Sequence, residues 1–257
     1  MLSRPVTAVL PALLALPLAA ALAAPSAAVA QSPPATGQIL LGIADDWSST
    51  TARLQAFDLM KKEGWRPAFE RPVSVLLGRG GLAWGLGVLP VPETGAHKRE
   101  GDRKAPAGFF ALGPVYGYDA ALPGQARYPY RQITRWDAWP DDPKNPYYNR
   151  HVVIDPAKGV PSWFEKQKMR HGDPAYRFLI DIRHNSDPKP VPGRGSAIFF
   201  HIRRGPDRPS FGCTTMRESD LVSLIQWLRP EAKPHYVLLP RAEYRRLREA
   251  WRLPEFE

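Results

Sequence analysis

A histidine and the only cysteine are the residues of this chain best suited to chemistry, and they lie twelve positions apart. His201 follows a short apolar run at 197–200 that is typical of a buried strand, and Cys213 follows a loop rich in glycine and proline. A loop of this length lets the chain leave one strand and return beside it. A neighbouring imidazole can take the thiol proton, and the thiolate is a strong nucleophile. We therefore predict that Cys213 is a nucleophile and His201 its base.

Two residues just before the cysteine fit the same chemistry. Gly212 has no side chain, so a substrate carbonyl has room to approach Cys213. The backbone N–H groups of Gly212 and Cys213 precede a predicted helix. We expect them to form an oxyanion hole, in which hydrogen bonds stabilise the negative charge of an acyl-transfer intermediate. The Ser210 hydroxyl is expected to hydrogen-bond either the backbone or the substrate.

Four further residues are predicted to bind substrate. Arg203 and Arg204 follow the histidine, and a guanidinium group can bind a carboxylate through two hydrogen bonds. His184 and Asn185 follow another apolar run, at 178–182, which we expect to lie beside the strand of His201. The interpretation of Arg203 and Arg204 depends on a substrate that carries free carboxylates.

Other kinds of site fit the sequence less well. A metal site needs three or four close His, Cys, Asp or Glu ligands, and the sequence has no His-x-x-x-His pair. The Gly-x-Ser-x-Gly motif of serine hydrolases is absent from the sequence, and a thiol redox protein would need a second cysteine. We therefore expect no metal and no cofactor. The competing interpretation of Cys213 is a buried, inert residue that packs as a small hydrophobe.

The N-terminal residues 1–30 have the pattern of an export signal. One positive charge, Arg4, precedes an uncharged stretch rich in Ala and Leu, which ends in Ala28-Val29-Ala30. Small residues at this spacing are typical of a signal-peptidase site. We predict a cleaved signal peptide at 1–30. An uncleaved membrane anchor is the alternative, because the stretch is nearly long enough to span a bilayer.

Composition limits the partners of the exported chain. The formal net charge is +10, and it falls to +9 without residues 1–30. A basic exported protein is attracted to anionic polymers of the cell envelope. No nucleic-acid-binding motif is recognisable, and no second apolar run is long enough for stable membrane insertion. We expect a monomer, located in the periplasm or cell wall, that does not bind nucleic acid.

Residues 31–257 are predicted to form one domain, with 31–37 as a linker. Short strands and few helices, without regular alternation, indicate a β-rich α+β fold. The predicted strands are 39–43, 109–112, 152–154, 178–182, 197–200 and 236–239; the predicted helices are 48–62, 163–169, 216–228 and 241–252; and a hairpin is predicted from 72–77 and 82–89 around the glycine-rich 78–81. The aromatic residues 122–150 are expected to pack on the sheet as a long ordered loop.

The motif residues resemble a known catalytic pattern. His201, Gly205, Ser210, Gly212 and Cys213 match the catalytic motif of the L,D-transpeptidase (YkuD-like) family: a His at a strand end, a Gly-containing loop, and Ser/Thr-x-Gly-Cys. The charged stretch 98–108 is similar to the family's Lys-x-Gly-Asp-Gly-Lys-Thr-Pro-x-Gly, and residues 141–149 are similar to another family stretch. The positions that depart from these patterns are Arg99, Arg103, Ala105, Phe211 and Thr215.

This resemblance implies a β-sandwich-like catalytic fold with flanking helices. It also implies a cysteine acyltransferase that acts on the tetrapeptide stems of peptidoglycan. The thiolate would attack the carbonyl before the terminal D-alanine, and the acyl group would pass to an amine of a second stem. Transfer to water instead would make the protein an L,D-carboxypeptidase. A third possibility is a non-catalytic module that binds peptidoglycan. Phe211 and Thr215 stand where better-known members have a His and an Arg or Asn, so the resemblance implies the acylation step more firmly than cross-linking.

Overall fold

The structure is a computed structural model that describes residues 32–256, so the predicted signal peptide lies outside the described residues. Most of its regular structure is β-strand. The strands of the main sheet are β1 (Gln38–Ala44), β2 (Thr51–Met60), β3 (Gly64–Pro67), β4 (Val73–Leu76), β5 (Leu82–Trp84), β6 (Ala105–Gly117), β7 (Tyr130–Gln132), β10 (Phe178–Ile182), β11 (Phe199–Ile202), β12 (Thr214–Met216) and β13 (His235–Pro240). A separate pair consists of β8 (Asp137–Ala138) and β9 (Val152–Val153).

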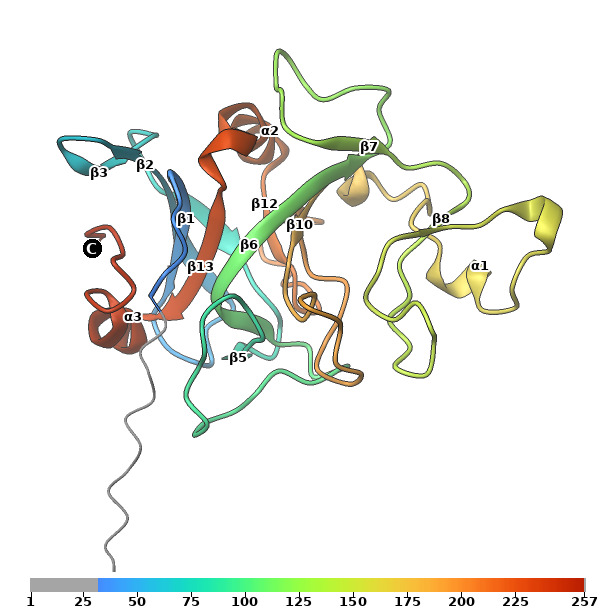
Figure 1. Ribbon diagram of the computed structural model, residues 1–257, viewed down its shortest axis with the longest axis horizontal. Coiled ribbons are helices and arrows are strands. Elements are labelled where there is room, and N and C mark those ends of the chain that lie inside the picture. The colour runs from blue at the N-terminus through green and yellow to red at the C-terminus, as the bar shows by residue number, and fades with distance from the viewer. Residues whose placement is uncertain (1–31, 257) are drawn as a thin grey trace, which may run out of the picture. The chain divides into compact units, whose positions relative to one another are not determined.

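The main sheet closes on itself. Its strand order is β1-β13-β6-β10-β11-β12-β4-β2, and β2 pairs again with β1. Leu41 of β1 therefore has Val237 of β13 on one side and Gln55 of β2 on the other. The long strand β6 crosses the middle of the sheet (Figure 1). The result is a closed, barrel-like sheet and not the expected sandwich of two sheets, because both sides of β1 are paired and no edge is left there.

The inside of the closed sheet holds the main hydrophobic core. Phe200 of β11 and Tyr236 of β13 are buried there with their ring centroids 4.6 Å apart. The Tyr236 hydroxyl is satisfied by the Thr214 hydroxyl at 3.0 Å. Successive side chains of a strand point to opposite faces. Because Phe200 points into the core, its neighbours Phe199 and His201 point to the outer face of the sheet.

The helices are short and lie around the sheet. They are α1 (Phe164–Gln167), α2 (Glu218–Trp227) and α3 (Arg241–Leu247), with 3-10 turns at η1 (Pro156–Lys158), η2 (Pro174–Tyr176) and η3 (Pro230–Ala232). Leu221, Leu224 and Ile225 of α2 are buried, as their spacing predicts. Across residues 32–256, every helix is too short or too polar to span a bilayer.

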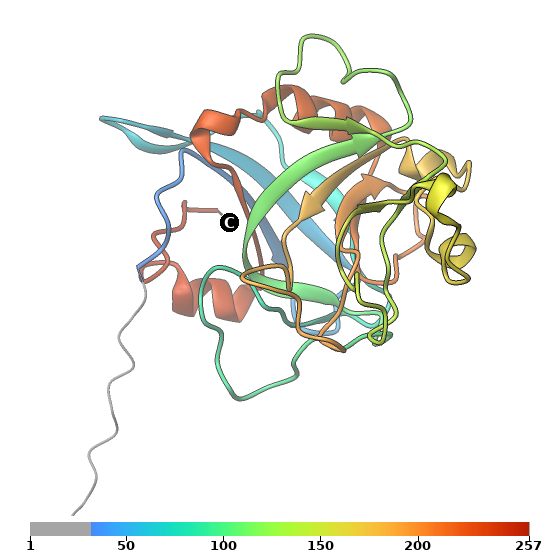
Figure 2. The same cartoon turned by 45° about the vertical axis from the view of Figure 1, so that its right-hand side comes forward.

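An aromatic segment, residues 118–177, covers part of the outer face of the sheet (Figures 1 and 2). Trp139 packs edge-to-face on Phe199 with ring centroids 4.9 Å apart, and on Tyr116 at 5.7 Å. Leu179, Met169 and the Tyr176 ring complete this second cluster. The prediction that residues 122–150 pack on the sheet is confirmed for Ile133 and Trp139, whereas Trp136 packs on Phe164 in a separate cluster and Tyr147 is exposed.

Most predicted strands are confirmed, but the strand before the cysteine loop is displaced. β11 begins at Phe199 and contains His201, although the prediction ended that strand at residue 200. Ala197 has φ 53°, which a strand cannot accommodate, so the strand starts after it. Two helices are shorter than predicted. α2 begins at Glu218, because Met216 still belongs to β12, and α3 ends at Leu247.

The helix predicted at 48–62 is wrong. Leu54, Phe57 and Met60 recur at every third position, but Met60 is exposed and the segment forms β2. β2 pairs with β1 on one side and with β3 and β4 on the other. These two ladders of backbone hydrogen bonds override the short three-residue spacing. In the strand, Leu54 and Phe57 point to opposite faces, and both are buried.

The hairpin predicted around residues 78–81 is also wrong. β4 pairs with β2 and β12, whereas β5 pairs with β6 in parallel. The glycine-rich segment between them runs beside two other loops: the Arg79 N–H donates to Ser210 O and the Gly80 N–H to Arg103 O, both at 2.9 Å. A Cβ at Gly78 would lie 2.4 Å from the Arg103 carbonyl oxygen. The glycines therefore permit close backbone packing. The Gly81 N–H donates to Gly78 O at 2.9 Å, so the segment does turn, but the turn does not join two paired strands.

This packing makes Gly78→Ala destabilising. The added methyl group would overlap backbone atoms that cannot move independently, and we expect the free energy of unfolding to fall by about 1–3 kcal/mol in urea denaturation. Gly205→Ala is the matched control, because its Cβ would have only Arg208 Cβ within 4 Å, at 3.7 Å. Equal stability of the Gly78 variant and the wild type would contradict the close packing.

Candidate functional site

The catalytic pair predicted from the sequence lies on two neighbouring parallel strands. In β11 and β12, Phe200 pairs with Thr214 and His201 with Thr215. Cys213, one residue before β12, therefore lies diagonal to His201 on the same outer face. The Cys213 Sγ contacts the Ala197 carbonyl oxygen at 3.5 Å. Within the described part of the chain no hydrogen bond joins this thiol to His201, so the thiol is held on the backbone in this conformation.

The contacts of His201 define its tautomer. The ring is buried, and its Nδ1 lies 2.9 Å from the Ile202 carbonyl oxygen. A carbonyl oxygen only accepts, so Nδ1 carries the proton and Nε2 carries the lone pair. Burial lowers the pKa of His201 to about 4, and the nearby Arg204 charge acts in the same direction. His201 is therefore a neutral base at neutral pH and not a resident imidazolium.

Burial acts on the thiol in the opposite sense. It raises the pKa of Cys213 to about 11, against the weaker effects of the Arg204 and Lys98 charges. An imidazolium beside a thiol lowers the pKa of the thiol, but His201 is neutral here. In this resting state both groups are neutral: His201 is buried, and Cys213 is only partly exposed.

The residues just before the cysteine form a tight hydrogen-bonded turn. The Ser210 hydroxyl donates to the Cys213 carbonyl oxygen at 2.5 Å and accepts the Gly212 N–H at 3.0 Å. Ser210 thus bonds the backbone, which is one of its two predicted roles. The Gly212 N–H is occupied and does not face a substrate here. Gly212 itself has φ 144°, and a Cβ would lie 3.0 Å from Lys104 O, so only glycine fits.

Two small cavities flank the pair, with Tyr176 between them. Cys213 lines a cavity of about 170 Å³ together with Trp139, Met169 and Phe199. His201 lines another of about 170 Å³ with Arg204, Phe211 and Thr215. Tyr176 lines both, and its ring packs edge-on against the His201 ring at 5.2 Å. The sequence offered no signal for Tyr176, because its place depends on the segment 118–177 folding back over the sheet.

The two predicted arginines differ in their surroundings. Arg204 donates two hydrogen bonds to Asp173 Oδ2, at 2.9 and 2.6 Å, and its guanidinium carbon lies 4.9 Å from the Tyr176 ring centroid. It therefore holds the η2 turn that carries Tyr176. The Arg203 backbone N–H donates to Met216 O at 2.8 Å, and Arg203 is partly exposed.

His184 and Asn185 do not join the site. His184 is buried; its Nδ1 accepts the Leu86 N–H at 3.1 Å, and its Nε2 donates to Arg194 O at 2.9 Å. The Asn185 side chain is also buried and bonds Val191 and Gly195 backbone atoms. Both side chains are saturated by backbone groups, which come from Leu86 and from the loop before β11. We therefore leave them out of the substrate-binding site.

The sequence also missed Asn149, which connects the site to its surroundings. Its Nδ2 donates to the carbonyl oxygens of His184 and Asn185 at 3.0 and 2.8 Å. Its Oδ1 accepts the Ala197 N–H at 2.9 Å and the Trp139 Nε1–H at 3.1 Å. Ala197 in turn holds the Cys213 thiol. The similarity of residues 141–149 to a family stretch was the only signal for this role.

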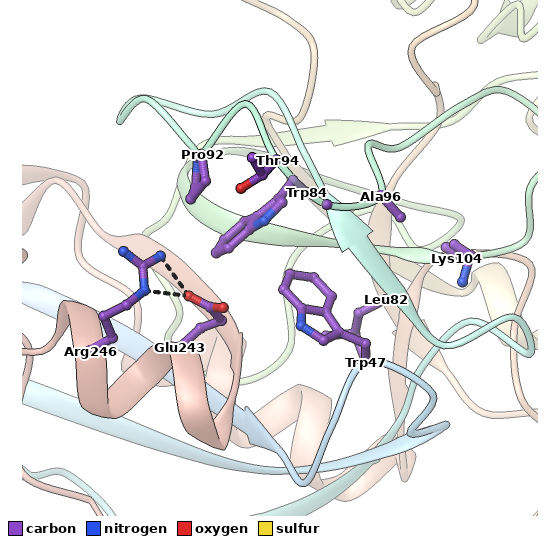
Figure 3. Close-up of a pocket in the computed structure, with 10 residues that line it drawn as sticks. Trp47, Leu82, Trp84, Pro92, Thr94, Ala96, Lys104, Glu243 and Arg246 are labelled. Carbon is purple, nitrogen blue, oxygen red and sulfur yellow. Dashed lines mark hydrogen bonds and ion pairs between the residues drawn. The ribbon is translucent and has the colours of Figure 1, made fainter. Parts of the chain in front are cut away.

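A cavity larger than these two is lined in part by the charged 98–108 loop. It measures about 420 Å³ and is lined by Trp47, Trp84 and Lys104 and by the Glu243–Arg246 ion pair of α3 (Figure 3). The two indole rings meet edge-to-face at 4.8 Å. None of the predicted site residues lines this cavity. The chemistry of the lining, rather than volume, therefore assigns the candidate active site to the cavities beside Cys213 and His201.

Comparison with known proteins supports this assignment. A family model described as the L,D-transpeptidase catalytic domain, YkuD, matches residues 52–237. The match covers well over half of the chain and includes both His201 and Cys213. Searches of the curated proteins and of the solved structures found no match.

The neutral state of the pair can be tested by thiol labelling. Because burial raises the pKa of Cys213 to about 11, iodoacetamide should label the native protein with a midpoint at higher pH than the urea-unfolded chain. His201→Gln should barely move this midpoint, since a neutral imidazole does not stabilise a thiolate by charge. Mass spectrometry measures the fraction of protein labelled, and Cys213 is the only cysteine of the chain. Rapid native labelling near pH 6 that His201→Gln abolishes would show an ion pair instead.

The structural role of His184 predicts a pH effect on stability. Burial lowers its pKa from 6.5 to about 4, so the unfolded chain binds the proton first and stability falls as pH drops from 6.5 to 4. We expect His184→Gln to remove roughly 3 kcal/mol of that fall, measured by urea denaturation across this range. Asn185→Ala should lower stability equally at every pH, because it does not titrate. An unchanged pH dependence in the His184 variant would refute this role.

Proposed function

The chain belongs to the L,D-transpeptidase (YkuD) catalytic-domain family, and from this premise we propose that it is an exported cysteine acyltransferase acting on peptidoglycan stem peptides. The family acts on peptidoglycan and is typically found in the periplasm or cell wall. The observation that carries the proposal is the register of β11 and β12, which puts Cys213 and His201 on one face. We also propose removal of residues 1–30 and a monomeric enzyme.

In the first step the substrate displaces the Cys213 thiol from the Ala197 carbonyl. His201 Nε2 takes the thiol proton, and the sulfur attacks the carbonyl carbon before the terminal D-alanine of a tetrapeptide stem. The carbonyl π electrons move to oxygen, where the Cys213 N–H is the proposed donor, since Gly212 is engaged with Ser210. The C–N bond then breaks, and D-alanine leaves with the proton from His201.

In the second step an amine attacks the thioester. His201 Nε2 takes the amine proton, the C–S bond breaks, and the sulfur recovers a proton from the imidazolium. An amine on a second stem gives a cross-link, and water gives a shortened tripeptide stem. Arg203 is proposed to bind a substrate carboxylate. Arg204, which is paired with Asp173, is proposed to hold the η2 turn that carries Tyr176. Its positive charge is proposed to favour a negatively charged substrate.

Purified disaccharide-tetrapeptides test this function directly. Wild-type protein should release D-alanine, and mass spectrometry should show a dimer, or a tripeptide if water is the acceptor. Cys213→Ala and His201→Gln should each lower turnover by about 10³-fold or more, and the double variant should be little worse, as for groups that act together.

His97→Gln is the control, because His97 bonds the Glu93 carbonyl oxygen far from the catalytic motif in sequence and lines neither cavity. Its activity should match the wild type. Substantial turnover by Cys213→Ala would refute the mechanism. Intact tetrapeptide that is retained but never cleaved by the wild type would favour a non-catalytic peptidoglycan-binding module.

A further inference from the structure

An exposed aromatic side chain stands next to the catalytic turn. Phe211, two residues before Cys213, is 67% exposed, the highest value among the large apolar residues that the structure describes. It lines the cavity that contains His201. An exposed Phe loses favourable burial and contributes nothing to the core. Its position at the mouth of the site therefore suggests contact with a ligand.

Two arginines from distant parts of the chain stack against this ring. The guanidinium carbon of Arg79 lies 4.6 Å from the Phe211 ring centroid, and that of Arg103 lies 6.0 Å from it. Both distances are within the range of cation–π contacts. Both arginines are exposed, and in residues 32–256 neither forms an ion pair with a carboxylate. Their positive charge is therefore uncompensated.

The backbone holds these arginines in place. The Arg79 N–H donates to Ser210 O, and Gly80 N–H donates to Arg103 O, each at 2.9 Å. Arg103 has φ 60°, a left-handed conformation that favours glycine. Glycine is the residue of the family stretch at this position, and Phe211 also departs from the family pattern. Two departures far apart in sequence thus meet in one cluster.

The nearest acid in sequence does not neutralise the cluster. Asp102 is bonded to Lys98 and accepts the backbone N–H groups of Arg99 and Lys104. The Lys104 ammonium group donates to Gly80 O at 2.7 Å and adds a further positive charge beside Arg79 and Arg103. The surface beside Phe211 is therefore positive and held by short backbone contacts.

We propose that Arg79, Arg103 and Phe211 form a carboxylate-binding subsite at the rim of the Cys213–His201 site. A guanidinium stacked on an aromatic ring keeps its N–H edge free, and this edge binds a carboxylate through paired hydrogen bonds. Because Phe211 lines the His201 cavity, the bound carboxylate belongs to a peptide that reaches the catalytic pair. The identity of that peptide as a peptidoglycan stem rests on the proposed function; the subsite itself does not.

The first test measures the electrostatic potential at the Cys213 thiol and needs no enzymatic activity. The single thiol is labelled with iodoacetate, which is anionic, and with iodoacetamide, which is neutral, and the ratio of rates is compared. Both reagents react with the same thiolate, so a change in the pKa or the exposure of the thiol alters both rates alike and leaves their ratio unchanged. Arg79→Gln and Arg103→Gly should each lower it by about twofold at low ionic strength, and added salt should reduce the difference. Arg103→Gly also relieves the left-handed backbone, so a weakened loop cannot explain the loss.

The second test measures binding in the inactive Cys213→Ala background. Calorimetry compares a disaccharide-tetrapeptide with the same molecule amidated at its carboxylates. The carboxylate form should bind about tenfold more tightly, and Arg79→Gln with Arg103→Gly should abolish this preference. Phe211→Leu should reduce it by releasing the stacked guanidiniums. Arg135→Gln is the matched control, because Arg135 stacks on Trp136 at 5.1 Å in the segment 118–177.

The outcomes separate the subsite from the proposed function. A lower labelling ratio and a lost carboxylate preference in the Arg79 and Arg103 variants support the subsite, even if the wild type never cleaves the peptide. An unchanged ratio, together with peptide affinities equal to those of the Arg135 control, would overturn it while leaving the acyl-transfer mechanism intact.

Discussion

The active-site geometry depends on one buried amide. Asn149 uses all its side-chain hydrogen-bonding atoms to join three segments: the aromatic segment through Trp139, the turn at 184–185, and the backbone of Ala197. Ala197 then determines where β11 begins and where the Cys213 thiol rests. A buried polar network of this kind is stabilising only when every member is satisfied. The site is therefore assembled by the loops around the sheet as much as by the sheet itself.

Burial gives the site a resting state with little reactivity. Cys213 and His201 are both neutral; His201 is buried, Cys213 is only partly exposed, and the Tyr176 ring packs edge-on against the histidine. A thiol is oxidised mainly as the thiolate. In the proposed mechanism, the thiol is therefore protected until a substrate enters the cavity and the thiol proton moves to His201 Nε2. Low intrinsic reactivity is compatible with the proposed catalysis, because Nε2 already carries the lone pair.

The sequence predicted that His201 and Cys213 would lie close together, and it predicted the β-rich class and most strands, because residue type and short apolar runs report these directly. It did not predict β2, because the spacing of Leu54, Phe57 and Met60 is that of a helix. The segment is a strand because neighbouring strands pair with it on both sides. Nor could it show that His184 would be saturated by backbone groups, since those partners come from distant loops. Tyr176 and Asn149 were missed for the same reason. Local patterns report local structure, whereas these roles arise from long-range contacts.

The closure of the sheet has a consequence for how the chain folds. β1 is among the first described residues to leave the ribosome, and its parallel partner β13 is among the last, as the Leu41–Val237 pair shows. Pairing over such a sequence separation is entropically costly and slow. While the chain is being made, β1 has only β2 as a partner and the ring stays open. A protein built this way remains incompletely folded until synthesis is nearly finished, and a chain in that state is compatible with the proposed export.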